Sequence, residues 1–347
     1  MNNKVKIGVV GLGMGRSHVE GFRSHPDAEV VALCDVNTNQ LGATADDFGI
    51  DQTFENFETM LDQSDLDAIS IAVPNYLHHP LTLKAFEAGL HVLCEKPIAM
   101  TAAQGDEMAA AARRAGKKLM VNFVSRFFPS CQALKRQVDR GVLGEVYFGR
   151  TLWHRRRGIP GFGGWFGTKE KSGGGPLIDI GVHRLDLALW LMGDPQPVAV
   201  TGAVYGHLGS EKAARENQAF DVEDMGCGLI RFDNAAALIL ETSWALNIAE
   251  EEYCQTQLCG TNGGLLQKLA FVPAYKETGE IYTEQDGHLY TTTHDKSTCH
   301  IPSSYDEFVN CIREDRDPSV TGEQAVKVQR IIEALYQSAE CGREVQL

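Results

Sequence analysis

Short apolar runs alternate with helix-like segments over the first third of the chain. Five runs rich in Val, Ile, Leu and Ala are predicted to be strands: 4–10, 30–34, 68–73, 91–94 and 119–124. Three segments between them are predicted to be helices: 15–24, 81–88 and 101–115. Thr101 is a good helix N-cap, and Gly89 and Gly116 stand where helices end. Strands that alternate with helices need crossover connections, so this part predicts an α/β fold with a doubly wound parallel sheet.

The pattern changes after about residue 123. Further helices are predicted at 129–140, 180–192, 305–314 and 323–341, and a strand at 146–155. Five more strands are predicted in succession, with no helix between them: 198–205, 225–232, 235–244, 252–259 and 265–271. Such a succession favours a mostly antiparallel sheet. The sequence therefore predicts two domains, 1–123 and 124–347. The second is of the α+β class, and its C-terminal helix either stays there or packs back on the first.

Composition narrows the class of protein. A chain of 347 residues that is 43% hydrophobic has enough apolar material for two cores. No apolar run approaches the ~18 residues that span a bilayer, and the absence of a signal-peptide core predicts a cytoplasmic protein. The net charge of −14 argues against nucleic acid or an anionic membrane as a partner. The nine cysteines form no C-x-x-C pair, so we expect reduced buried thiols and no metal site.

A glycine-rich turn follows the first predicted strand. Gly11, Gly13 and Gly15, with Met14 between them, would let the backbone approach a pyrophosphate at a helix N-terminus, although the third glycine comes one residue early for G-x-G-x-x-G. Asp35 ends the second strand, 24 residues after Gly11, near the spacing expected for a carboxylate that accepts both ribose hydroxyls. It would repel a 2′-phosphate, which favours NAD over NADP. The alternative interpretation is a tight turn and a surface aspartate.

Two further strands end in candidate cofactor residues. Pro74 and Asn75 follow the third strand, and ligands of open α/β sheets bind outside the carboxyl ends of the strands. His78 is predicted either to line the nicotinamide region or to make a cap-like contact at a helix start. The fourth strand ends in Glu95 and Lys96, followed by a proline that would direct Lys96 toward the nicotinamide through a cis or a trans bond. The alternative is that Lys96 only pairs with Glu95.

A second polar set lies in the segment 172–190. Asp179 and His183 are four residues apart and therefore share a helix face, and Asp186 lies three residues further along. Together with Lys96 they form a set that can handle protons. Histidine can take the hydroxyl proton of a carbinol that loses hydride, lysine can lower the pKa of that hydroxyl, and aspartate can orient the substrate or the histidine. The alternative is a surface or helix-capping pair.

These motifs together resemble the glucose–fructose oxidoreductase / inositol dehydrogenase / rhizopine-catabolism (Gfo/Idh/MocA) family. The resemblance rests on GLGMGRSH, AVPNYLHH, AGLHVLCEKPIAMT and GGGPLIDIGVHRLDLALWLMG, in this order, and on a similar C-terminal tail. It implies a Rossmann domain followed by an α/β domain with a large open, mostly antiparallel sheet, a nicotinamide cofactor, and hydride transfer at a sugar or polyol carbon. The resemblance implies that Lys96, Asp179 and His183 are catalytic. It also implies that Asp35 binds the ribose and that Pro74 and Asn75 lie beside the cofactor.

Substrate recognition is predicted in the segment WHRRRGIPGFGGWF, residues 153–166. Trp153, Phe162 and Trp165 are candidates to stack on a pyranose, and Arg157 is a candidate to bind hydroxyls or a carboxylate. Arg126, after the fifth strand, is a further candidate. The alternative is a subunit contact or a packed aromatic hook.

The sequence therefore predicts an NAD-dependent dehydrogenase or reductase acting on the CH–OH group of a sugar or polyol. Two rivals remain: a glycosidase of the same family that oxidises and re-reduces its sugar with bound NAD, and a non-catalytic regulator that senses a dinucleotide. Strands such as ALILETSWAL carry apolar residues on both faces. Helices of the same chain can cover one face of the sheet, so the other face needs a partner subunit to cover it. We therefore expect a homodimer or a homotetramer.

Overall fold

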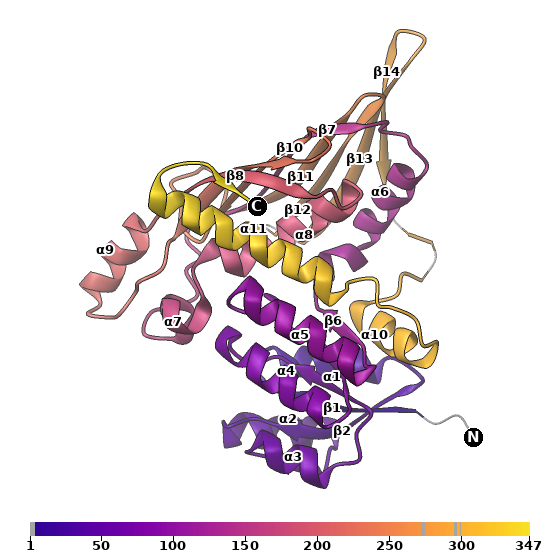
Figure 1. Cartoon of the computed structure of the whole chain (residues 1–347), viewed down its shortest axis with the longest axis vertical. Helices are drawn as coiled ribbons and strands as arrows, with labels where there is room; N and C mark the ends of the chain where they lie inside the picture. The colour runs from indigo at the N-terminus through magenta and orange to yellow at the C-terminus, as the bar shows by residue number, and fades with distance from the viewer. Residues whose placement is uncertain (1–3, 272–274, 295–296, 299) are drawn as a thin grey trace. The chain divides into compact units, whose positions relative to one another are not determined.

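The computed structural model describes residues 4–271, 275–294, 297–298 and 300–347 (Figure 1). The chain forms two compact units: 1–123 with 302–327, and 124–301 with 328–347. The sequence suggested domains 1–123 and 124–347, so the two divisions differ in the segment 302–327, which belongs with the first unit. This segment contains one complete helix and the start of the last helix.

The first unit contains a six-stranded sheet in which all neighbouring strands are parallel. The order is β3-β2-β1-β4-β5-β6, the doubly wound arrangement in which the strand order reverses between β1 and β4. Its strands are β1 (Val5–Val10), β2 (Ala28–Cys34), β3 (Gln52–Phe54), β4 (Ala68–Ile71), β5 (His91–Cys94) and β6 (Leu119–Val121). Its helices are α1 (Gly15–Arg23), α2 (Thr38–Phe48), α3 (Phe57–Gln63), α4 (His78–Glu87), α5 (Ala102–Ala115), α10 (Ser304–Arg313) and the first residues of α11 (Gly322–Cys341). The sequence did not predict α2, β3 and α3.

Local sequence accounts for the element ends in this unit. The Thr101 side chain accepts a hydrogen bond from the backbone N–H of Gln104, as an N-cap does, and Gly116 ends α5 in a left-handed conformation at φ +63°. The strands β1, β4 and β5 are buried on both faces, which explains why they read as continuous apolar runs. The prediction of a parallel sheet is confirmed.

The second unit contains a nine-stranded sheet in the order β14-β13-β12-β11-β7-β10-β9-β8-β15. Only β7 and β10 pair in parallel; the other neighbours are antiparallel. Its strands are β7 (Val146–Arg155), β8 (Pro197–Tyr205), β9 (Met225–Phe232), β10 (Ala237–Ser243), β11 (Glu252–Gly260), β12 (Gly263–Ala270), β13 (Lys276–Gln285), β14 (His288–His294) and β15 (Val345–Gln346). Its helices are α6 (Pro129–Asp139), α7 (Lys169–Ser172), α8 (Val182–Leu191), α9 (His207–Arg215) and the rest of α11, and the π-helical turn Leu177–Gly181 leads into α8.

Two expectations for this unit were wrong. The helix α9 interrupts the succession of strands between β8 and β9, and the strands β13 to β15 were not predicted. Only Gly209 and Ala213 of α9 are buried, so this helix lacks the apolar stripe that periodicity detects. The strand β14 is almost entirely exposed and carries three threonines, so it is not an apolar run.

The helices α6 and α8 cover one face of this sheet (Figure 1). Their apolar residues pack against strand residues in a core that includes Leu134, Leu187, Leu191, Leu258 and Leu265. The opposite face of the sheet carries apolar residues that alternate with these buried positions along the strands. They are only half-buried: Phe148, Leu229, Ile239 and Leu266.

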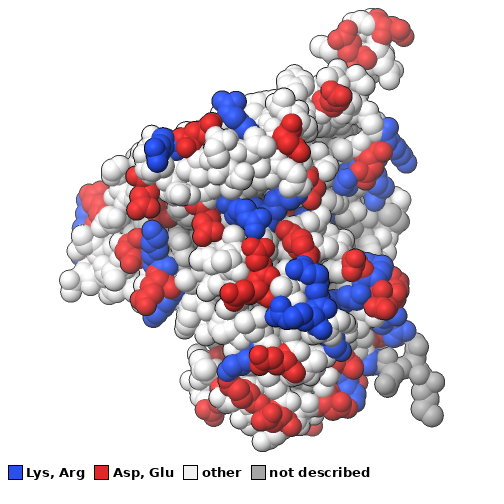
Figure 2. Space-filling model, viewed as in Figure 1, with Lys and Arg blue, Asp and Glu red and all other residues white. Residues whose placement is uncertain are grey.

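No helix in the described part of the chain is long and apolar enough to cross a membrane. Acidic and basic side chains are interspersed on the face of the molecule that Figure 2 shows. Among the described cysteines, Cys34, Cys94, Cys131, Cys254 and Cys311 are buried free thiols, as expected. In contrast, Cys227 and Cys259 are half-buried and Cys341 is exposed.

Candidate functional site

The glycine-rich turn after β1 is shaped by two close backbone approaches. Gly11 has φ +81°, and a Cβ there would lie 2.5 Å from the carbonyl oxygen of Ala72. A Cβ on Gly15 would lie 2.9 Å from a methyl group of Val9. A Cβ on Gly13 would meet no atom within 4 Å, and Met14 is 60% exposed. The turn therefore leaves open backbone at the N-terminus of α1, where phosphate groups bind in this fold.

Asp35 is tied to this turn. Its Oδ2 accepts a hydrogen bond from the N–H of Leu12 at 2.6 Å, and its Oδ1 accepts one from the N–H of Asn37 at 2.7 Å. A pocket of about 250 Å³ brings together the predicted residues Gly11, Asp35 and Pro74. Apolar side chains form much of its wall: Val10, Val36, Phe57, Val73, Leu77 and Leu81. Apolar walls around one carboxylate fit a flat base and the hydroxyls of a ribose.

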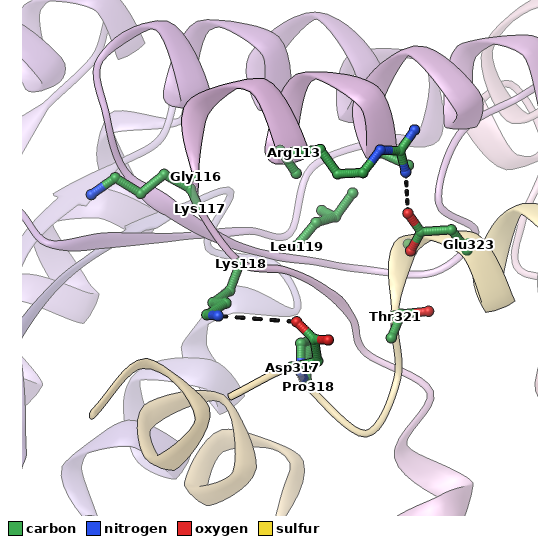
Figure 3. Close-up of a pocket in the computed structure, with 12 residues that line it drawn as sticks. Arg113, Gly116, Lys117, Lys118, Leu119, Asp317, Pro318, Thr321 and Glu323 are labelled. Carbon is green, nitrogen blue, oxygen red and sulfur yellow. Dashed lines mark hydrogen bonds and ion pairs between the residues drawn. The ribbon is translucent and has the colours of Figure 1, made fainter. Parts of the chain in front are cut away.

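A second pocket in the first unit, of about 430 Å³, contains none of the predicted site residues (Figure 3). Figure 3 shows Arg113 paired with Glu323 and Lys118 paired with Asp317 at this pocket. Leu119, at the amino end of β6, also lines it. Ligands of open α/β sheets bind at the carboxyl ends of the strands, so this pocket is not the dinucleotide site.

Lys96 follows β5, next to a buried carboxylate. Glu95 is 8% exposed, and its Oε1 accepts hydrogen bonds from His18 Nε2 at 3.0 Å and Asn122 Nδ2 at 2.6 Å. The other nitrogen of His18 lies 2.7 Å from the hydroxyl of Ser70. Burial raises the pKa of Glu95, but the hydrogen bond and charge of His18, the charge of Lys96 and the hydrogen bond from Asn122 together lower it to about 2. A carboxylate whose lowered pKa favours the ionised form therefore lies directly before Lys96 in the chain.

The alternative interpretation, in which Lys96 only pairs with Glu95, stays open, because the backbone N–H of Lys96 donates to Glu95 Oε2 at 3.2 Å. The Glu95 side chain is directed into the unit, toward His18 and Asn122, rather than into solvent. The peptide bond between Lys96 and Pro97 is cis. His18 and Asn122 could not be predicted as partners of Glu95 from local motifs, because each is separated from Glu95 by many residues along the chain.

His78 connects two of the predicted turns. It is 1% exposed, with Nδ1 2.7 Å from the carbonyl oxygen of Pro97 and Nε2 2.9 Å from that of Val73. A neutral imidazole has one N–H and donates to one of the two carbonyls, and burial lowers the pKa of His78, which favours this neutral form. These contacts lie at the start of α4, and a place for His78 beside the nicotinamide stays a prediction. Asn75 is also buried, whereas Pro74 is half-buried.

In the second unit, Asp179 lies on the π-helical turn and His183 on the first turn of α8. Asp179 is 9% exposed, and its Oδ2 accepts a hydrogen bond of 3.0 Å from the indole Nε1–H of Trp244, which is fully buried. His183 is half-buried, and its ring centroid lies 6.0 Å from that of Trp153. The sequence predicted that the carboxylate and the imidazole share a helix face; in the structure they lie on consecutive helical turns, and Trp244 was not predicted.

Arg126 is buried, and its guanidinium is engaged by a carboxylate. It is 3% exposed, and its Nε and Nη2 donate to Asp186 at 2.9 and 2.5 Å. Burial raises the pKa of Asp186, an effect that the charge of Arg126 opposes. The guanidinium of Arg126 is therefore already engaged by Asp186, and a contact between Arg126 and the substrate stays a prediction. The bidentate geometry satisfies both planar groups inside the unit.

Trp153 lies in a polar and aromatic cluster beside His183. Its Nε1–H donates to Glu252 Oε1 at 2.6 Å, and the same oxygen accepts from Arg155 Nε at 2.8 Å. Phe271 stacks on the Trp153 ring with centroids 5.7 Å apart, and the Arg155 guanidinium lies 5.2 Å from the ring centroid. Trp153 therefore already makes contacts within the protein. The residue is half-buried, and its ring lies near the imidazole of His183.

The other predicted substrate residues pack within the second unit. Phe162 lies edge-on to Phe220 at 5.5 Å, and Trp165 stacks on Phe166 at 3.8 Å. Arg157 donates to the carbonyl oxygen of Leu246 at 3.2 Å and to Asn247 Oδ1 at 2.8 Å. These contacts are those expected of a packed aromatic segment, and binding of a sugar by these residues stays a prediction. Phe162 and Trp165 are nevertheless only half-buried.

The fold and these residues define a two-domain oxidoreductase with a dinucleotide-binding sheet. Two family models match the chain: the NAD-binding Rossmann fold of an oxidoreductase family over residues 5–123, and the C-terminal alpha/beta domain of the same family over residues 135–347. The chain therefore belongs to the Gfo/Idh/MocA oxidoreductase family, as the resemblance indicated.

Three known proteins illustrate the similarity. The D-glucoside 3-dehydrogenase of Escherichia coli (strain K12) is 36% identical to this chain over 356 residues, which cover 100% of the chain and 98% of the relative. The aldose-aldose oxidoreductase of Caulobacter crescentus, solved with glycerol, is 27% identical with a TM-score of 0.84, covering 99% of this chain and 100% of that one. GenD2 from gentamicin A biosynthesis, solved with NAD, is 26% identical with a TM-score of 0.83, covering 99% of this chain and 97% of that one.

Proposed function

We propose that this enzyme transfers hydride between NAD and a secondary carbinol of a sugar or polyol. The observation that carries the proposal is the anchored pair in the second unit: an aspartate and a histidine on consecutive turns, with the carboxylate held by a buried indole. The membership in an oxidoreductase family supports it. Similarity to a D-glucoside 3-dehydrogenase over the whole chain makes a pyranoside the preferred substrate class.

The residues of the first unit fit a dinucleotide. Gly11, Gly13 and Gly15 leave open backbone at the start of α1 for the pyrophosphate, and Asp35 offers its carboxylate to the ribose within the apolar pocket. The fixed charge of Asp35 favours NAD over NADP. When bound, the nicotinamide supplies the hydride acceptor or donor. We propose that the first unit holds the cofactor and the second holds the substrate.

The chain's own residues would handle the proton and orient the substrate. His183 takes the hydroxyl proton of the carbinol as its carbon loses hydride, and returns it in the reverse direction. Lys96 lowers the pKa of that hydroxyl and stabilises the carbonyl oxygen that forms. Asp179, held by Trp244, accepts a hydrogen bond from the substrate or from His183. Trp153, beside His183, presents an apolar edge to the sugar ring.

A substrate screen with matched lysine variants tests this function. Polyols, aldoses and glycosides are incubated with NAD or NADP, and the absorbance of the reduced cofactor is followed. Lys96→Met and His183→Ala should each lower kcat at least a hundredfold, as expected for a positioned acid–base group worth about 10²- to 10⁴-fold. The affinity for NAD and the melting temperature of both variants should stay close to those of the wild-type protein. Lys84→Met is the control, because Lys84 pairs with Glu58 on the helix surface.

The same screen separates the rival activities. Release of a hydrolysed sugar without net reduction of NAD would identify the redox glycosidase. Binding of NAD with no turnover of any compound would identify a sensor. A folded Lys96→Met variant with near-normal turnover would refute the catalytic role of this lysine.

A further inference from the structure

A buried carboxylate holds the start of the turn that carries Asp179. Glu223 is 7% exposed, and its Oε2 accepts from the N–H of Gly175 at 2.8 Å while its Oε1 accepts from the N–H of Leu177 at 3.1 Å. Pro176, between these two donors, has no N–H. The two carboxylate oxygens therefore bridge the amides on either side of the proline. Asp179 follows only two residues after Leu177, so Glu223 fixes the backbone immediately before it.

Tyr336 of α11 completes this arrangement. Its hydroxyl donates to Glu223 Oε1 at 2.7 Å, so three donors meet one carboxylate. Burial raises the pKa of Glu223, an effect that the hydrogen bonds from Tyr336 and from the two amides oppose. Burial and the neighbouring Glu223 raise the pKa of Tyr336, which keeps its hydroxyl a donor. Because the first N–H groups of a helix have no partner inside the helix, a carboxylate is well suited to this position.

The glycines before the turn are required by these contacts. A Cβ on Gly175 would lie 2.0 Å from the carbonyl oxygen of Glu223, and a Cβ on Gly174 would lie 2.2 Å from the hydroxyl oxygen of Tyr336. No larger residue fits at either position without moving the backbone or the tyrosine. The glycine-rich stretch before α8 therefore permits the close approach of Glu223 and Tyr336.

The same short segment also reaches the carboxylate of Asp179. The residue after Glu223 is Asp224, and its carbonyl oxygen accepts a hydrogen bond of 2.9 Å from the N–H of Trp244. Trp244 in turn donates its indole N–H to Asp179 at 3.0 Å. Residues 223–224 therefore hold the turn at its backbone and, through Trp244, at its functional carboxylate.

We infer that Glu223 and Tyr336 are positioning residues for Asp179 and His183. This inference rests on the proposed function, because it assigns to the Glu223–Tyr336 pair the task of keeping two proton-handling groups in register with the substrate. Neither residue needs to touch the substrate. A displacement of about 1 Å in a reacting group can lower the rate about a hundredfold, so loosening this anchor acts on turnover.

Two conservative variants and one control test the inference. Tyr336→Phe removes only the hydroxyl, and Glu223→Gln places an amide N–H₂ against backbone N–H donors. We expect kcat to fall about threefold to tenfold in Tyr336→Phe and about tenfold to a hundredfold in Glu223→Gln. KM and NAD affinity should stay within about twofold. Tyr282→Phe is the control, because Tyr282 also donates to a glutamate, Glu280, within the strand β13.

Amide exchange measured by mass spectrometry over the peptide 173–181 provides a readout that is independent of turnover. Exchange should be faster in Tyr336→Phe and Glu223→Gln and unchanged in Tyr282→Phe. Folded variants with wild-type kcat, or with unchanged exchange in this peptide, would overturn the inference. If the wild-type protein turns over no sugar or polyol, the proposed function fails. In that case faster exchange in the variants would still show that Glu223 and Tyr336 hold this turn in place. Unchanged exchange would refute this structural role as well.

Discussion

The indole Nε1–H of Trp244 donates a hydrogen bond of 3.0 Å to Oδ2 of Asp179, between two residues separated by 65 positions in the sequence. Trp244 is fully buried, so its N–H has no access to water and Asp179 is the partner that satisfies it. The same bond limits where the carboxylate can point. One oxygen of Asp179 is therefore held in place by Trp244.

We predict that Trp244→Phe lowers kcat about tenfold with little change in KM for the sugar. The phenyl ring retains most of the apolar contact but cannot donate, so the carboxylate loses its orientation. Steady-state kinetics, NAD titration and a thermal melt measure the effect. Trp190→Phe is the control, since the Trp190 ring packs against Arg126 and Lys135 at the other end of α8. A folded Trp244→Phe variant with normal kcat would contradict the role of this bond.

Local sequence patterns predicted the secondary structure that carries the site. The strands 91–94, 146–155 and 225–232 have the predicted limits, because each is a compact run between clear turn signals. Polar segments such as β14 and α9 were missed, because their side chains are largely exposed and carry no apolar period.

The contacts that fix the site were not visible in the sequence. Glu95 receives hydrogen bonds from His18 and Asn122, which are 77 and 27 residues away. Arg126 was predicted to contact substrate because it follows a strand end, yet its partner Asp186 lies 60 residues further on. A motif shows which chemical groups are present; the tertiary fold decides whether a group faces solvent or a buried partner.

Cofactor choice is predicted to depend on Asp35. Its two oxygens already accept backbone N–H groups, so the charge is fixed in place and would face a 2′-phosphate. We expect NAD to be preferred at least tenfold in kcat/KM, about 1.4 kcal/mol, and Asp35→Ser to narrow or reverse this preference. Asp47→Ser is the control, because Asp47 pairs with Arg16 on the surface. Equal efficiency with NAD and NADP in the wild-type enzyme would refute the prediction.

The open face of the nine-stranded sheet leads us to propose a homodimer or a homotetramer. Phe148, Leu229, Ile239 and Leu266 are half-buried on the face opposite α6 and α8. Covering apolar side chains of this kind is a common reason for subunit association. Ile239→Lys should lower the mass measured by light scattering at micromolar protein, with Lys135→Glu on the helix-covered side as a control. A wild-type monomer under these conditions would exclude the proposal.

Acid should destabilise the first unit partly through His91. Its Nδ1 accepts the N–H of Lys118 at 3.0 Å, and burial, then the charges of Lys117 and Lys118, lower the pKa of His91 to about 4. The unfolded chain has an ordinary histidine pKa of about 6.5. Below pH 6.5 the histidine is therefore protonated in the unfolded state but stays neutral in the folded state. The free energy of unfolding consequently decreases as the pH falls from 6.5 to about 4.

His91→Asn should remove this part of the pH dependence, because the amide oxygen can still accept from Lys118. The free energy of unfolding is measured in urea at pH 7 and at pH 4. Its fall between these two pH values should be about 1–2 kcal/mol smaller in the variant than in the wild-type protein. His79→Asn is the control, since His79 pairs with Glu107 on the helix surface. An unchanged pH slope in His91→Asn would contradict the assignment.

Two buried arginines of the second unit should respond to the same substitution with changes in stability of very different size. Arg126 forms a bidentate pair with Asp186, which is fully buried. Arg184 is also fully buried, but its Nη2 donates only to Thr256 and Gln267, and its Nε and Nη1 have no hydrogen-bond partner among the described residues. One guanidinium is thus matched by a carboxylate, and the other faces only neutral acceptors.

We therefore predict that Arg126→Met costs about 3–5 kcal/mol of unfolding free energy, because it leaves the Asp186 carboxylate buried without its cation. Arg184→Met should change stability by no more than about 1 kcal/mol in either direction, because a methionine of similar length removes unsatisfied donors as well as two hydrogen bonds. Urea unfolding of both variants gives the comparison. The double variant Arg126→Met with Asp186→Leu should recover most of the loss, since it removes the orphaned charge. A larger loss for Arg184→Met than for Arg126→Met would show that the charge pairing is not what distinguishes the two sites.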